Sequence, residues 1–160
     1  MLIRALTEKD IPAWLALAHE GDDIVSGMVP DIATFYKGFD EYMKSKIKQQ
    51  EAFMVVDKTT DKCLGIVAFS KKHNRITFLG VIIKADYNKV GRELMKVALN
   101  QMDITKEITA NIFKSNAEMM RKERSLLEDF GFTRTDNTIL EAGAPAYQMK
   151  RPPRKMVSVG

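Results

Sequence analysis

The first part of the chain begins with a strand pattern and continues into a helical pattern. Residues 2–6 alternate between apolar and polar side chains, which is typical of a half-buried strand. Either Thr7 or Asp10 can cap the helix that follows, and Pro12 is tolerated only near the start of such a helix. Apolar positions spaced three and four apart then predict one buried helical face over residues 11–18.

Four further elements are expected before the middle of the chain. After an acidic loop over residues 20–31, apolar positions at steps of three and four predict a long helix over residues 32–47. Three apolar runs, at residues 52–57, 63–70 and 75–83, are predicted to be strands. The segments that join these strands are too short for a crossover connection, so the three strands should form an antiparallel meander.

The second half of the chain alternates between helices and strands. An apolar stripe predicts a helix over residues 90–102, followed by a strand at 107–113 and a helix over 116–131. Two terminal strands are expected at residues 132–136 and 146–151. The element order β-α-α-β-β-β-α-β-α-β-β therefore predicts an α/β (α+β) fold with a mixed sheet. In that sheet an antiparallel meander precedes a parallel pair, because a strand–helix–strand crossover favours parallel strands.

Size and composition indicate one ordinary globular domain. The chain has 160 residues, of which 45% are hydrophobic and 29% charged, enough to bury a core without disulfides or metals. The net charge of +4 comes from the C-terminal segment, because without its four basic residues the basic and acidic side chains balance at 21 each. We therefore expect a single domain over residues 1–150 and a basic, solvated tail over residues 151–160.

The cysteine and histidine content restricts the chemistry. The single cysteine, Cys63, excludes an internal disulfide and suits a reducing compartment. The sequence contains no signal-peptide pattern and no apolar run of membrane length, so we expect a cytoplasmic protein without a membrane partner. His19 and His73 are too few and too isolated to form a metal site, and no metal is expected.

One short stretch stands out, where the meander meets the next helix. The apolar run of residues 76–83 stops at a polar segment, residues 84–89, and a helical pattern starts around Gly91 and Arg92. The N-terminus of a helix offers unpaired backbone N–H groups and the positive end of the helix dipole. With the basic side chains of this segment added, the loop and the first helical turn can hold an anion.

The same stretch resembles a motif of the GNAT superfamily of N-acetyltransferases. In that family a run of the form V-x-P-x-x-[RQ]-x-x-G-x-[GA] follows the fourth strand, and VIIKADYNKVG, residues 81–91, aligns with it without gaps. Val81 and Gly91 match the family pattern. The chain departs from the pattern at the proline, at the Arg or Gln and at the first glycine, where it has Ile83, Asp86 and Lys89.

A second segment extends the resemblance towards the C-terminus. The family has a strand, an asparagine, a helix and a terminal [YF]-x-x-x-G-F, which is similar to ITANIFKSN…LLEDFGF here. Asn116, Gly131 and Phe132 match, and Leu127 takes the position where the family often has a tyrosine. Together with the order of elements, the resemblance covers nearly the whole chain and implies a GNAT-like fold.

The resemblance also implies where acetyl-CoA binds. In the family two parallel strands splay apart, here residues 76–82 and 107–113, and pantetheine pairs with the open strand edge that contains Leu79 and Val81. The N–H of Val81 would stabilise the oxyanion of the transferring acetyl group. Asn116 would bond a pantetheine amide, cap the following helix, or do both. The pyrophosphate would lie against Tyr87, Asn88, Lys89, Val90, Gly91 and Arg92.

Acyl transfer to an amine needs a group that accepts a proton, because only the neutral amine attacks. In this family the loop between the first two helices overlies the acceptor pocket. Glu20 and Asp22 lie in that loop and are the candidates for this role, with His19 behind them. Glu51, just before the second strand, is a reserve candidate.

The departing thiolate raises a separate question about a proton donor. Many members of the family place at the position of Leu127 a tyrosine that protonates the thiolate, and leucine cannot do so. Tyr87 and Tyr147 are the candidate substitutes, and Tyr147 is preferred because the last strand runs beside the acceptor cleft in this family.

The sequence thus predicts an N-acetyltransferase that moves an acetyl group from acetyl-CoA, its acyl-donor cosubstrate, to a primary amine by direct attack through a tetrahedral intermediate. The departures from the family motifs leave open a catalytically degenerate module that binds acyl-CoA for regulation. The basic tail leaves open a small nucleic-acid-binding protein, although a nucleic acid is the less favoured partner. The acceptor amine is not specified by the sequence, and a homodimer is compatible with it.

Overall fold

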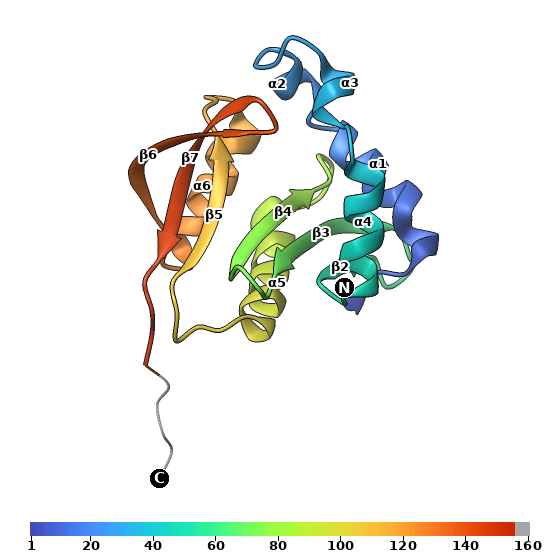
Figure 1. The fold of residues 1–160 in the computed structure, drawn as a ribbon. Coiled ribbons are helices and arrows are strands. Elements are labelled where there is room, and N and C mark those ends of the chain that lie inside the picture. Colours follow the sequence, from blue (N-terminus) through green and yellow to red (C-terminus); the bar gives the residue numbers. More distant parts are fainter. Residues whose placement is uncertain (156–160) are drawn as a thin grey trace.

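The computed structural model describes residues 1–155, which form a seven-stranded mixed sheet covered by helices on both faces (Figure 1). The strand order is β1-β2-β3-β4-β5-β7-β6, and only the β4–β5 pair is parallel. The predicted mixed sheet, with a meander before a parallel pair, is therefore confirmed. The strands are β1 (Leu2–Ala5), β2 (Ala52–Val56), β3 (Cys63–Ser70), β4 (Arg75–Val81), β5 (Ile108–Phe113), β6 (Thr133–Glu141) and β7 (Ala144–Arg151).

The helices between β1 and β2 differ from the prediction. A 3-10 turn, η1 (Glu8–Asp10), precedes α1 (Ile11–His19), and the expected acidic loop contains a short helix, α2 (Asp22–Ser26). The single helix expected over residues 32–47 is two helices, α3 (Ile32–Phe35) and α4 (Phe39–Lys48). They separate at Gly38, whose φ of +81° is left-handed and interrupts a right-handed helix.

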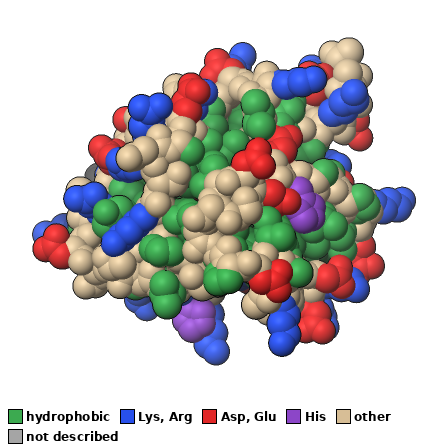
Figure 2. Space-filling view, turned by 90° about the horizontal axis from the view of Figure 1, so that it is seen from above, with side chains coloured by type: hydrophobic (Ala, Val, Ile, Leu, Met, Phe, Trp, Pro, Cys, Tyr) green, Lys and Arg blue, Asp and Glu red, His purple; other side chains and the backbone are tan. Residues whose placement is uncertain are grey.

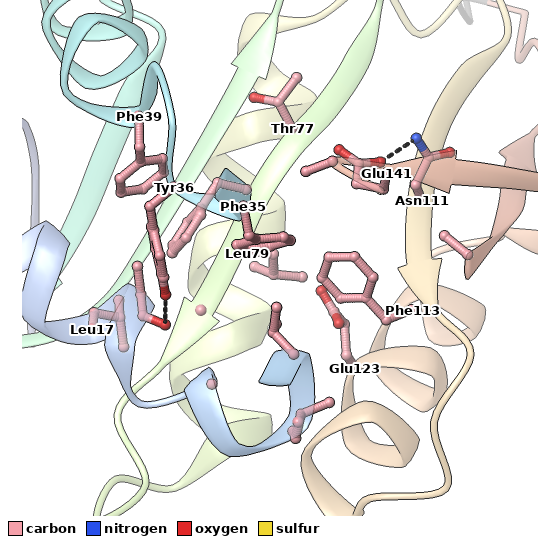
Figure 3. Close-up of a pocket in the computed structure, with 18 of the residues that line it drawn as sticks. Leu17, Phe35, Tyr36, Phe39, Thr77, Leu79, Asn111, Phe113, Glu123 and Glu141 are labelled. Carbon is pink, nitrogen blue, oxygen red and sulfur yellow. Dashed lines mark hydrogen bonds between the residues drawn. The ribbon is translucent and has the colours of Figure 1, made fainter. Parts of the chain in front are cut away.

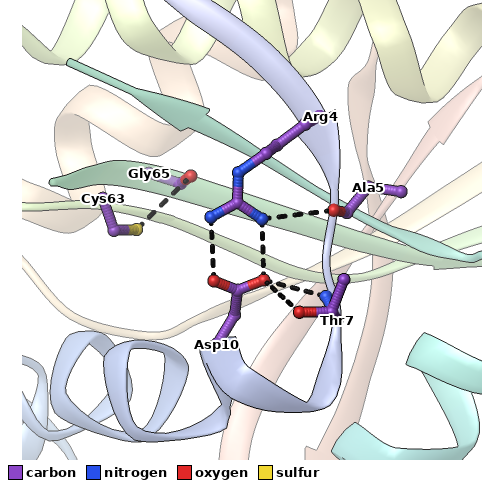
Figure 4. Close-up of polar contacts among 6 residues, drawn as sticks. All are labelled: Arg4, Ala5, Thr7, Asp10, Cys63 and Gly65. Atoms are coloured by element: carbon purple, nitrogen blue, oxygen red, sulfur yellow. Dashed lines mark hydrogen bonds and ion pairs between the residues drawn. The ribbon is translucent and has the colours of Figure 1, made fainter. Parts of the chain in front are cut away.

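An ion pair fixes how β1 leads into η1 and α1 (Figure 4). The Asp10 carboxylate accepts two hydrogen bonds from the Arg4 guanidinium, at 2.8 and 2.9 Å, and one from the Thr7 N–H at 2.8 Å. These bonds hold the pKa of Asp10 below its usual value, with the Arg4 guanidinium as the main cause. Thr7 is the N-cap of η1 and Asp10 the N-cap of α1, but the Asp10 side chain makes no capping hydrogen bond to α1.

The core has two parts because both faces of the central strands are buried. Along β3, Val67 and Phe69 point towards α5 (Tyr87–Gln101) and α6 (Glu118–Asp129), whereas Ile66 and Ala68 point towards α1 and α4. This two-sided burial explains why the strand reads as a continuous apolar run. On the second face the fully buried Trp14 meets the rings of Phe39, Tyr42 and Phe78 edge-on, with centroids 5.6 to 6.1 Å apart.

The parallel strands β4 and β5 separate soon after they start. They pair only at Arg75–Thr109 and Ile76–Ala110, and beyond this point the two strands diverge (Figure 1). β5 turns its other edge to β7, which pairs with it along its whole length. The edge of β4 that faces β5 is consequently open from Thr77 to Val81, as the splayed pair in the prediction requires.

The end of the described chain is more ordered than the sequence pattern indicated. β6 and β7 are longer than the predicted strands and meet in a tight turn at Ala142 and Gly143, both with positive φ. Arg151 closes β7, is buried, and donates from Nε to the Phe130 carbonyl at 2.8 Å. Of the predicted tail, residues 156–160 lie outside the described residues, and the domain boundary at residue 150 stays a prediction.

Candidate active site

A pocket of about 450 Å³ opens where β4 and β5 separate. Its walls come from both strands, from α1 to α4 on one side, from α6 on the other, and from the β6–β7 turn (Figure 3). Viewed from this end, hydrophobic surface lies between acidic side chains (Figure 2). The aromatic side chains that line the pocket are Phe35, Tyr36, Phe39, Tyr42, Phe78 and Phe113.

The open edge of β4 forms one wall of the pocket and presents backbone donors to it. The Ile82 N–H donates to the Leu64 carbonyl at 2.9 Å, towards β3. Because successive N–H groups of an extended strand point to opposite sides, the N–H of Val81 points towards the gap between β4 and β5. Leu79 and Val81, both predicted to contact the cofactor, line the pocket.

The opposite wall carries a polar group that the sequence reasoning missed. Asn111 of β5 donates from Nδ2 to Glu141 Oε2 at 2.6 Å, while its own Oδ1 is buried without a hydrogen-bond partner in the described structure. Across the pocket, the hydroxyl oxygens of Tyr42 and Thr77 lie 2.5 Å apart. A buried acceptor without a partner costs free energy, so Asn111 Oδ1 is suited to accept a hydrogen bond from a ligand.

Of the two predicted proton acceptors, Glu20 lines this pocket, whereas Asp22 lies outside the lining and contacts Tyr36, which lines it. Glu20 Oε1 accepts a hydrogen bond from the Ile83 N–H at 2.9 Å, which links the end of α1 to the β4–α5 loop. Asp22 Oδ1 lies 2.5 Å from the Tyr36 hydroxyl, and its Oδ2 lies 2.6 Å from His19 Nδ1. Burial and the charge of Asp22 raise the pKa of Tyr36. Asp22 thus positions Tyr36, which lines the pocket directly.

The first turn of α5 is the predicted pyrophosphate site. Asp86 is its N-cap, and its side chain accepts a hydrogen bond from the Lys89 N–H at 3.1 Å. Asn88 and Lys89 are exposed, whereas Tyr87 is half-buried, with a pKa raised by burial. One of the unpaired N–H groups that an anion would use is therefore already bonded to a carboxylate.

The remaining residues of this turn also face protein. Val90 and Gly91 are buried against the core, and a Cβ on Gly91 would lie 2.6 Å from Leu126 Cδ2. Arg92 lies over the Phe130 ring, 5.1 Å from its centroid, and 3.7 Å from the Asp129 carboxylate. Gly91 was predicted to lie against the pyrophosphate; in the structure its missing side chain allows the close packing of α5 on α6.

Three other predicted residues have different surroundings from those expected. Asn116 is exposed and precedes the residue that caps α6, Ala117, so its predicted capping role is wrong. Glu51 is buried outside the pocket, 3.3 Å from Lys46 Nζ. Tyr147 does not line the pocket, and the Lys114 and Arg134 cations lie over its ring, each 4.5 Å from its centroid.

Besides Glu141 of β6, the pocket has a second acidic residue that was not predicted from the sequence, Glu123 of α6. Figure 3 shows its side chain pointing into the pocket beside Phe113. Burial is the main cause that raises the pKa of its carboxyl to about 8, and the charge of Glu141 adds to it. A signal was present in the sequence, since Glu123 precedes the buried Leu127 by one helical turn and so shares its face.

Other chemistries have less support in the described part of the chain. Cys63 is half-buried outside the pocket lining, and burial raises the pKa of its thiol to about 11, so it is a poor nucleophile at neutral pH. Within residues 1–155, no group of three or more His, Cys, Asp or Glu side chains could hold a metal ion. Within the same range, no helix is both long enough and apolar enough to cross a bilayer.

Comparisons with known proteins agree with this geometry. A family model described as an acetyltransferase (GNAT) domain matches residues 16–152. No curated protein matches the chain.

Solved structures share the fold at low sequence identity. The ribosomal-protein-alanine N-acetyltransferase of Brucella melitensis is 15% identical, with a TM-score of 0.64 over 95% of this chain and 99% of that chain. Ard1 of Thermoplasma volcanium is 17% identical, with a TM-score of 0.64 over 96% and 98%. The NatB acetyltransferase complex bound to CoA and MES is 14% identical, with a TM-score of 0.61 over 94% and 98%.

Proposed function

Because the chain belongs to the acetyltransferase (GNAT) family, we propose that it is an N-acetyltransferase that moves an acetyl group from acetyl-CoA to a primary amine. One observation carries this proposal: the open edge of β4 lines a pocket and directs the Val81 N–H into it. A backbone donor held there by strand pairing is suited to an acyl-transfer reaction, because negative charge develops on the carbonyl oxygen during attack.

The chemical groups of acetyl-CoA suit those that line the gap between β4 and β5. The pantetheine arm is a chain of amides, and amides pair with an open strand edge as a peptide does in β-augmentation. Leu79 and Val81 would supply that edge, and Asn111 Oδ1 is an acceptor without a partner on the other wall. Asn116, exposed at the start of α6, would contact the same arm. A structural neighbour, the NatB complex, carries CoA.

The pyrophosphate would lie at the first turn of α5. The backbone N–H groups of this turn and the exposed side chain of Lys89 favour an anion, while Asp86 opposes it. Val90 and Gly91 can contribute only backbone groups, because their side-chain positions face the core. The other members of the proposed phosphate site are Tyr87, Asn88 and Arg92.

In the proposed reaction a neutral amine attacks the thioester carbonyl, and the Val81 N–H stabilises the oxyanion of the tetrahedral intermediate. Glu20 and Asp22 would attract the ammonium form to the rim and accept its proton. Direct attack is favoured over a covalent intermediate on Cys63, since that thiol is half-buried and protonated at neutral pH.

A second candidate function is binding of acyl-CoA without catalysis. It is favoured by Asp86, which places a carboxylate on the helix N-terminus that a pyrophosphate would use. Both candidates require CoA to bind, and only the first requires turnover.

Turnover is tested by following CoA thiol release from acetyl-CoA against a panel of primary amines, with the amide product identified by mass spectrometry. The N–H of Val81 is tested by Val81→Pro, with Val81→Ala as the matched control that keeps the donor. Proline is tolerable on an edge that makes no ladder bond. We expect a loss of kcat of about 10²-fold in Val81→Pro relative to Val81→Ala. No amide product with any amine, together with retained CoA binding, would instead identify a binding module.

A further inference from the structure

One side of α6 faces the pocket and carries a single carboxyl into it. Met119, Met120 and Glu123 line the pocket, and Leu127 continues the same side into the core. The residues three and four positions apart on a helix share a face, so Glu123 stands between apolar neighbours along α6. Its side chain points into the space between β4 and β5 (Figure 3).

The groups around Glu123 come from three elements. α5 contributes Tyr87, whose pKa is raised by burial and by the charge of Glu123. β5 contributes the neutral Asn111 and Phe113, and β6 contributes Glu141, which shares the pocket. Arg75 also lines the pocket but bonds Thr109 where β4 and β5 pair, and no ion pair to Glu123 occurs within residues 1–155.

These surroundings favour the neutral form of the carboxyl. Apolar neighbours and the nearby charge of Glu141 raise the pKa of Glu123 to about 8, so the group holds a proton at neutral pH. A thiol has an ordinary pKa of about 8.5. General acid catalysis is most effective when the donor is protonated at the working pH and close in pKa to the group that it protonates.

Other proton donors of the pocket are less suitable. The Tyr36 hydroxyl is committed to Asp22, and the Tyr42 hydroxyl lies against Thr77. Burial raises the pKa of both phenols, so neither gives up a proton readily. Leu127 has no proton to donate, and Tyr147 lies outside the pocket lining.

We propose that Glu123 is the general acid that protonates the thiolate of CoA as it leaves. In this step the carbon–sulfur bond of the tetrahedral intermediate breaks, its electron pair goes to sulfur, and sulfur takes the proton of the Glu123 carboxyl. The products are the amide, free CoA thiol and the Glu123 carboxylate, which is protonated again from solvent. This role rests on the proposed acetyl transfer.

The first test measures the state of the carboxyl without any turnover. The side-chain carboxyl carbons of glutamate are labelled with ¹³C, and the signal of Glu123 is assigned by its absence in Glu123→Gln. We expect this signal to titrate near pH 8. A titration of Glu123 at its ordinary value, near pH 4.3, would overturn the proposal, because the group would then hold no proton at neutral pH.

The second test compares rates over pH. At saturating amine, kcat/KM for acetyl-CoA is measured for the wild type and for Glu123→Gln, with Glu128→Gln as the matched control. We expect a loss of about 10²-fold in Glu123→Gln at pH 7. The ratio of wild type to variant should fall about tenfold per pH unit above pH 8, as Glu123 loses its proton. Glu123→Met is a second variant that also has no proton to donate but suits an apolar site. It should show the same loss, which would exclude a folding defect caused by the amide of Gln as the reason.

The two proposals fail in different ways. Acetyl transfer by the wild type with an unchanged rate and pH profile in both Glu123 variants would overturn the role of Glu123 alone. Absence of acetyl transfer by the wild type with every amine would overturn the proposed function, and this role with it.

Discussion

The carboxylate of Asp86 accepts a hydrogen bond from the backbone N–H of Lys89 at 3.1 Å, across the first turn of α5. Asp86 stands where the family motif has an Arg or Gln, and Lys89 stands where it has a glycine. The two departures therefore belong to one structural feature. A carboxylate caps the helix end at which an anion would bind, and a lysine side chain projects from the same turn.

Asp86→Asn should strengthen CoA binding. Asparagine caps a helix about as well as aspartate, so the helix keeps its start while a negative charge near the pyrophosphate is removed. We expect a threefold to tenfold lower Kd by calorimetry at low salt, which corresponds to roughly 1 kcal/mol. Asp103→Asn, which removes an equal charge beyond the other end of α5, is the control and should leave Kd unchanged. Equal Kd values for wild type and Asp86→Asn would show that no anion binds at this turn.

Gly91→Ala should destabilise the protein through its contact with Leu126. The added methyl group would lie 2.6 Å from the buried Leu126 Cδ2, and this crowding outweighs the advantage of alanine in a helix of about 1 kcal/mol. We expect a net loss of about 1 kcal/mol in urea unfolding. In a Leu126→Ala background the same substitution should stabilise the protein. Destabilisation of equal size in both backgrounds would rule out this contact as the cause.

The central strands and α5 could be predicted from sequence for clear physical reasons. β3 is apolar along its length because helices cover both faces, and α5 has a strong apolar stripe because one side packs on the sheet. The open edge of β4, in contrast, was inferred from the family resemblance. No local pattern encodes the divergence of two strands, which depends on what packs between and beside them.

The errors also have local causes. The apolar spacing continues through Gly38, so one helix was predicted over residues 32–47, although the left-handed φ of Gly38 divides it. Helix α2 has only five residues, too few for a periodic pattern to be recognised. Glu123 was missed because an acidic residue in a charged helix is ordinarily solvated. Its spacing from Leu127 indicates the helix face, but only the tertiary structure shows that this face lines a pocket.

Neutralising Glu20 and Asp22 together, as Glu20→Gln and Asp22→Asn, should lower kcat/KM by about 10²-fold or more if either accepts the proton of the amine. Asp23→Asn, an exposed neighbour in α2, is the control. Single variants separate the two roles, because Asp22 also holds Tyr36, whereas Glu20 holds the β4–α5 loop. Unchanged kinetics in the double variant would show that neither carboxylate accepts the proton of the amine and that water accepts it instead.

The raised pKa of Glu123 should make stability depend on pH. In the unfolded chain the carboxyl ionises near pH 4.3, but in the folded state it keeps its proton up to about pH 8. Between these values the folded state binds more protons, so the free energy of unfolding falls as pH rises.

Glutamine does not ionise, so Glu123→Gln removes this pH dependence. The free energy of unfolding of the variant should therefore rise relative to that of the wild type from pH 5 to pH 8. We expect a gain of several kcal/mol, since each tenfold change in proton binding corresponds to about 1.4 kcal/mol. Denaturant unfolding at three pH values measures it. A stability difference that stays constant with pH would mean that Glu123 is ionised in the folded state.

The central claim is that acetyl-CoA binds along the open edge of β4 and against the first turn of α5. It is tested most directly by titrating ¹⁵N-labelled wild-type protein with acetyl-CoA and following the backbone amide signals. We predict the largest changes at Leu79 and Val81 in the strand and at residues 87–92 in the helix. Changes absent from both segments, or confined to other parts of the chain, would contradict the account.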